Sequence, residues 1–169
     1  PGNHHMKYGY HFKDFDIETR DRNFINIESL QKEIKKILEN SRSTEFISKF
    51  LHDSLEQARG EEELFIEFSI PFKPNDPDLW IEVFKDNFGE KTAIRKVSDQ
   101  DMNAVHQAEY MDLKMITLPD VVFKSLSEMT SSKGDKILSY ESELEKADEN
   151  RIFVPEDELT EYEKFMIKH

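Results

Sequence analysis

The chain has 169 residues and no cysteine, and its 36 acidic and 23 basic residues give a formal net charge of −13. This length fits one domain, and the lack of cysteine excludes both a disulfide framework and thiol chemistry. Nucleic acids and anionic membrane surfaces are bound by clustered lysine and arginine. We therefore expect neither of them as a direct partner.

The bulk composition nevertheless predicts a folded protein, because thirteen phenylalanines supply the large apolar groups that disordered chains lack. Residues 1–5, PGNHH, have the composition of an expression-vector remnant. We therefore expect a single α+β domain over residues 6–169. No apolar run approaches the length of a membrane span, so we expect a soluble protein of the cytoplasm, either of a bacterium or of a virus-infected host cell.

In the first half of the chain, aromatic residues alternate over 7–12 and predict a strand. Apolar residues recur at helical spacing over 24–41 and 43–60, which predicts a helical hairpin. Alternation returns over 64–70, predicting a second strand. Three prolines at 71, 74 and 77 predict an irregular turn. Segments 79–85 and 92–97 then flank a five-residue loop and predict a β-hairpin.

In the second half, residues 99–110 and 119–129 are predicted helices, and 112–118, 136–140 and 151–154 are predicted strands. Residues 156–168 form a predicted C-terminal helix. The intervening residues 141–150 are expected as a flexible acidic loop. Because hairpins occur among the strands, we expect an α+β fold. Its sheet would be mixed or largely antiparallel with about five to six strands, and the N-terminal helical hairpin and the other helices would pack on it.

Common catalytic motifs are missing from the sequence. The native glycines, Gly9, Gly60, Gly89 and Gly134, lie too far apart to build a phosphate-binding loop. No G-x-S-x-G elbow and no H-E-x-x-H metal motif occurs either. The sequence therefore predicts no cofactor, and it favours a protein that is not an enzyme.

Acidic residues concentrate at 141–163, a segment that contains ten acidic residues and two basic residues. Carboxylates in the first turn of the terminal helix complement its dipole and need no further function. The acids of 141–149 have no such explanation, because crowded like charges destabilise a fold unless a flexible loop or a basic partner offsets them. The expected partner-binding residues are Glu141, Glu143, Glu145, Asp148, Glu149, Glu156, Asp157, Glu158 and Glu161, with help from Glu61, Glu62 and Glu63.

By elimination, we interpret the chain as an acidic protein-binding module that binds and inhibits or neutralises a basic protein. A nucleic-acid-processing enzyme or a toxin would be such a partner, by analogy of charge and size with immunity proteins and virus-encoded inhibitors. Two alternatives stay open. The first is a metal-dependent hydrolase without a standard motif, using the pairs His106 and Glu109 or His52 and Glu56. The second is a subunit of a larger assembly whose aromatic residues form an interface.

Overall fold

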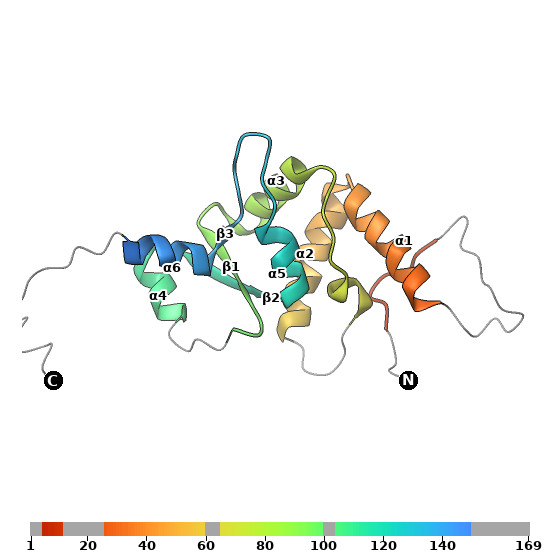
Figure 1. The fold of residues 1–169 in the computed structure, drawn as a ribbon, viewed down its shortest axis with the longest axis horizontal. Coiled ribbons are helices and arrows are strands. Elements are labelled where there is room, and N and C mark those ends of the chain that lie inside the picture. The colour runs from red at the N-terminus through yellow and green to blue at the C-terminus, as the bar shows by residue number, and fades with distance from the viewer. Residues whose placement is uncertain (1–4, 12–25, 60–64, 100–103, 150–169) are drawn as a thin grey trace, which may run out of the picture.

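The computed structural model describes residues 5–11, 26–59, 65–99 and 104–149. Figure 1 shows the elements along the chain. They are α1 (Ile27–Asn40), α2 (Thr44–Arg59), the 3-10 helix η1 (Ile66–Ser69), α3 (Pro77–Phe88), β1 (Thr92–Lys96), α4 (Ala104–Tyr110), β2 (Lys114–Leu118), α5 (Asp120–Ser127), β3 (Leu138–Ser139) and α6 (Tyr140–Glu149). The expected strand 151–154 and helix 156–168 lie outside the described residues.

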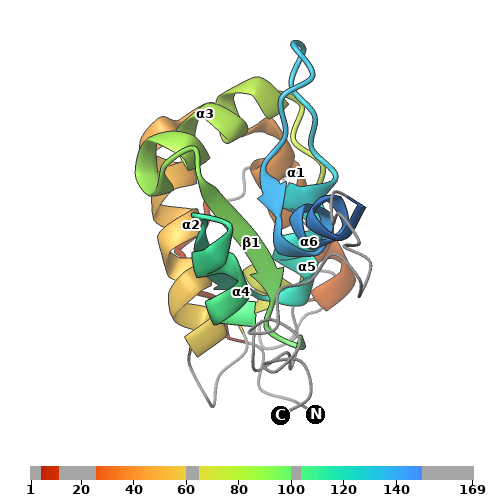
Figure 2. The same cartoon turned by 90° about the vertical axis from the view of Figure 1, so that its left-hand side faces the viewer.

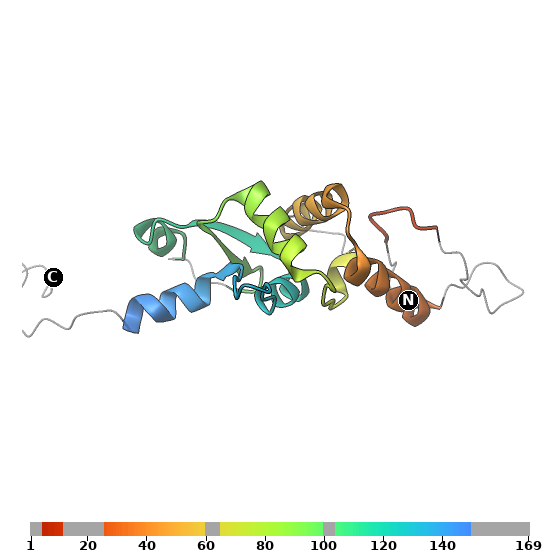
Figure 3. The ribbon, with the colours of Figure 1, turned by 90° about the horizontal axis from the view of Figure 1, so that it is seen from above.

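The three strands form one parallel sheet in the order β2-β1-β3. In its register Ile94 of β1 is paired with Ile116 of β2 on one side and with Ser139 of β3 on the other. The connection from β1 to β2 contains α4, whereas the connection from β2 to β3 contains α5 and passes β1 in the opposite direction. Right-handed crossovers in opposite directions place their helices on opposite faces of a sheet. Figures 2 and 3 accordingly show α2, α3 and α4 on one side and α5 and α6 on the other.

The prediction of a mixed or antiparallel sheet with five to six strands is therefore wrong, because the described chain contains three strands and all of them are parallel. The predicted strands at 92–97, 112–118 and 136–140 are confirmed in shorter form. The helices predicted between them are also confirmed, within 99–110 and 119–129. A helix between consecutive strands is typical of parallel pairing, since it supplies the crossover that parallel strands need.

The two helices of the predicted helical hairpin are confirmed as α1 and α2. Asn26 caps α1, and its side chain accepts hydrogen bonds from the amides of Glu28 at 3.0 Å and Ser29 at 3.3 Å. Such a cap satisfies amides that have no partner within the helix. None of the helices in the described ranges is long and apolar enough to cross a lipid bilayer.

The predicted β-hairpin at 79–97 is wrong, because its first half is the helix α3. Asp76 caps this helix by accepting a hydrogen bond from the Leu79 amide at 3.2 Å, and Pro77 is its first residue. Proline is favoured at that position because its amide would have no helical partner. At the other end Gly89 takes a positive φ of 96°, which suits glycine. The proline interpreted as part of a turn therefore begins a helix.

The predicted strands at 7–12 and 64–70 are also wrong. Residues 7–11 have no strand conformation, and His5 makes only an isolated bridge with Phe65. Residues 66–69 form the single 3-10 turn η1. Its Glu67, which strand alternation would place in solvent, is completely buried. The strand prediction from alternating apolar residues failed because a short 3-10 turn can bury successive side chains, here Ile66, Glu67 and Phe68.

An aromatic cluster joins α2, η1 and α3 in the main core. The ring of Phe50 is fully buried and lies 5.3 Å from the ring of Phe68, 5.6 Å from that of Phe72 and 5.8 Å from that of Trp80. Large aromatic rings bury much apolar surface, and tilted or edge-to-face pairs add to that gain. Phe50 is consequently the side chain on which both helices and the turn between them pack.

We predict that Phe50→Ala lowers the free energy of unfolding by about 3 to 5 kcal/mol, because it removes buried surface and leaves a cavity among three rings. Urea denaturation followed by far-UV circular dichroism measures this loss. Val97→Ala is the control, since Val97 is 48% exposed and should change stability by less than about 0.5 kcal/mol. Equal effects of the two substitutions would contradict this position of Phe50.

Candidate functional site

The acidic residues of 141–149 lie on the helix α6, so the expected flexible loop is wrong for 141–149. Tyr140 anchors the start of this helix: its ring is 2% exposed and its hydroxyl donates a hydrogen bond to the Gln107 carboxamide. Leu144, one turn later, packs against the same small core. The spacing of Tyr140 and Leu144, four residues apart, is a helix signal that the sequence analysis missed.

The predicted site residues on this helix differ in position and in their contacts. Glu141, Glu145 and Glu149 are exposed and fall four residues apart, so they form one row along α6. Glu143 lies off this row and accepts a hydrogen bond from the Lys146 ammonium at 2.6 Å. Asp148 belongs to α6, but its side chain is outside the described residues. The remaining predicted residues, Glu156, Asp157, Glu158 and Glu161, and the additional Glu61, Glu62 and Glu63, also lie outside them.

The row on α6 begins at the carboxyl edge of the sheet. Glu141 forms an ion pair with Lys96, the last residue of β1, at 2.8 Å. The Lys96 ammonium also lies 5.6 Å from the centre of the Phe123 ring on α5. The hydrogen bond and charge of Glu141 raise the pKa of Lys96 above its ordinary value. This pair ties the first turn of α6 to the central strand, while Glu145 and Glu149 have no ion-pair partner among the described residues.

Sequence reasoning missed a second acidic row, on α3. Asp78, Glu82 and Asp86 follow one another four residues apart on the exposed side of that helix, and Glu90 lies just beyond its end. The buried side of α3 is formed by Trp80, Ile81, Val83, Phe84 and Phe88. Recognising Asp76 and Pro77 as a helix start would have revealed this row, because a helix separates Glu82 from the buried Trp80 and Phe84, which a strand would place on the same face.

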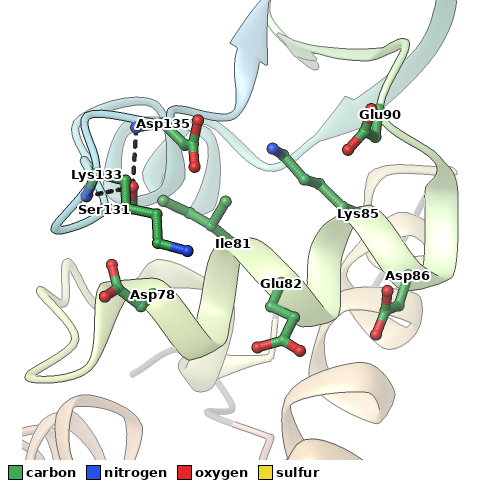
Figure 4. Close-up of a pocket in the computed structure, with 9 residues that line it drawn as sticks. All are labelled: Asp78, Ile81, Glu82, Lys85, Asp86, Glu90, Ser131, Lys133 and Asp135. Atoms are coloured by element: carbon green, nitrogen blue, oxygen red, sulfur yellow. Dashed lines mark hydrogen bonds between the residues drawn. The ribbon is translucent and has the colours of Figure 1, made fainter.

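Two hollows flank the row on α3. The first has a volume of about 390 Å³ and is shown in Figure 4. It is lined by Asp78, Ile81, Glu82, Lys85, Asp86, Glu90, Ser131, Lys133 and Asp135. The second, of about 400 Å³, lies between α3 and the start of α2 and shares Glu82 and Asp86 with the first. These two carboxylates therefore form a ridge with a depression on either side.

Carboxylates outnumber lysines in the first hollow by five to two. Neither Lys85 nor Lys133 forms an ion pair with a described residue. Figure 4 shows Glu82 and Asp86 pointing away from the 131–135 loop, whereas Lys85 extends into the space between Glu90 and Asp135. A concave surface with excess carboxylate attracts cationic groups, and its open sides leave room for long lysine or arginine side chains.

A tight loop over residues 131–135 forms one wall of this hollow. The Ser131 amide donates to the Asp135 carbonyl at 2.8 Å, and the Asp135 amide returns a hydrogen bond to the Ser131 hydroxyl at 2.8 Å. Asp78 holds the loop against α3 by accepting hydrogen bonds from the amide and the hydroxyl of Ser132, both at 2.6 Å. These two hydrogen bonds hold the pKa of Asp78 below its ordinary value. The wall is thus fixed to the acidic row itself.

The residues of the metal alternative stay in separate pairs. His106 and Glu109 are both exposed on α4, with Nδ1 and Oε2 at 3.7 Å. His52 lies near Asn87, with Nε2 and Oδ1 at 3.2 Å, and Glu56 forms an ion pair with Lys7 at 3.5 Å. Over the described ranges, no group of three or more His, Cys, Asp or Glu side chains is arranged to hold a metal ion.

Comparisons of this chain with protein-family models, with curated proteins and with solved structures found no match.

We predict that Asp78→Asn loosens the 131–135 loop, because the carboxamide has one oxygen to accept the two hydrogen bonds from Ser132. Hydrogen exchange of the Ser132 amide should become about fivefold faster. In the unsubstituted chain a lowered pKa means that the tether is complete above the ordinary value of 3.8 and is lost only as the pH falls through the lower folded-state pKa. Loosening between pH 6 and pH 4 would contradict this assignment.

Proposed function

We propose that the chain is an acidic protein-binding module that covers a basic surface of another protein. The observation that carries this proposal is the ridge of Glu82 and Asp86, exposed on α3 between two hollows. Carboxylates one helical turn apart stand about 6 Å apart along the helix. Lysine or arginine side chains of a partner can therefore reach successive carboxylates while their aliphatic stems enter the hollows.

The row of Glu141, Glu145 and Glu149 on α6 supplies a second surface of the same chemistry. The net charge of −13 speeds the encounter with a basic protein over a distance, whereas the two rows would fix the geometry of the complex. A partner that processes nucleic acid has a basic groove for phosphates. Ordered carboxylates that enter such a groove would inhibit it, which is the mode of action we propose for this chain.

Other functions have less support from the described residues. A subunit of a larger assembly would expose a broad apolar patch. The large apolar side chains exposed in the described ranges are Met6, Ile27 and Val97, which come from three separate segments. The metal-dependent hydrolase stays a hypothesis that metal analysis of the purified protein would test.

We predict that the double substitution Glu82→Lys with Asp86→Lys weakens binding to the basic partner at least tenfold, since attraction becomes repulsion at the ridge. Glu145→Lys with Glu149→Lys tests the α6 row in the same way. Partners are captured on the immobilised chain from a lysate of the source cells and eluted in rising salt. Mass spectrometry identifies them, and calorimetry with the purified partner gives the affinity.

The matched control is Glu109→Lys with Glu128→Lys, which makes the same change of net charge at exposed positions outside both rows. Retained binding in this control, together with loss in the ridge variant, supports a docking surface. An equal loss in all three variants would mean that net charge alone attracts the partner, and the proposed surface would be wrong.

A second candidate function is the binding of a small anionic molecule at the carboxyl edge of the sheet. In the order β2-β1-β3 the connection from β1 runs to one side and the connection from β2 runs back past β1 to the other side, and ligands of open parallel sheets bind outside the carboxyl ends of the strands at such a point. Two basic residues, Arg95 and Lys96, end β1 there, beside the first turn of α6. An anion would replace Glu141 as the partner of Lys96.

The two candidates predict different effects of changing Glu141. If an anion binds at the carboxyl edge, Glu141→Gln should strengthen its binding about threefold by removing the competing carboxylate, and Lys96→Ala should weaken it. Calorimetric titration with inorganic phosphate and with small phosphorylated compounds measures both changes. No binding to the unsubstituted chain or to Glu141→Gln at millimolar concentration would exclude this candidate.

A further inference from the structure

We draw no further inference here: the strongest candidate, the hollow of about 150 Å³ between residues 72–77 and the end of α5, is lined by the apolar side chains of Phe72, Pro74, Pro77 and Met129, but nothing in the structure shows what covers it.

Discussion

The packing of α3 against Phe50 of α2 is the contact on which the rest of the surface depends. Trp80 of α3 and Phe72 of the proline-containing connection before it pack against the Phe50 ring, and this contact determines which side of α3 is buried. Residues four apart lie on the same face of a helix. Burying the face that carries Trp80 therefore places Asp78, Glu82 and Asp86 on the opposite, exposed face. The hydrophobic core and the acidic ridge are thus two consequences of a single helix orientation.

The acidic residues of the two rows are either exposed to solvent or bound by a nearby ion pair or hydrogen bond. The α6 row is held at its first residue by the pair of Glu141 with Lys96, and the α3 row is held at its first residue by the hydrogen bonds of Asp78 with Ser132. Each row is therefore fixed at one end and open along the rest, so that the remaining carboxylates are available to a partner. Glu141 also connects the two candidate functions, since it neutralises the lysine that an anion would require.

The buried acids follow a different rule from the exposed ones. Glu67 and Asp53 are buried, and residues 5–11 donate hydrogen bonds to Oε1 of Glu67 and to Oδ2 of Asp53, whereas Oε2 of Glu67 has no hydrogen-bond partner among the described residues. A buried carboxylate makes its donors hard to remove, so these two residues convert an irregular segment into a fixed part of the fold.

The sequence alone determined the helices α1 and α2, the three strands and the helices between the strands, because the spacing of apolar residues over several turns or alternations reflects local geometry. It did not determine α3 or η1, whose short apolar runs fit a strand as well as a helix. It predicted the acids of 141–149 as a site but not that they form a row, and it missed the ridge on α3. Only the tertiary structure decided parallel pairing, the orientation of α3 and the burial of Glu67, because each results from contacts between residues far apart in the chain.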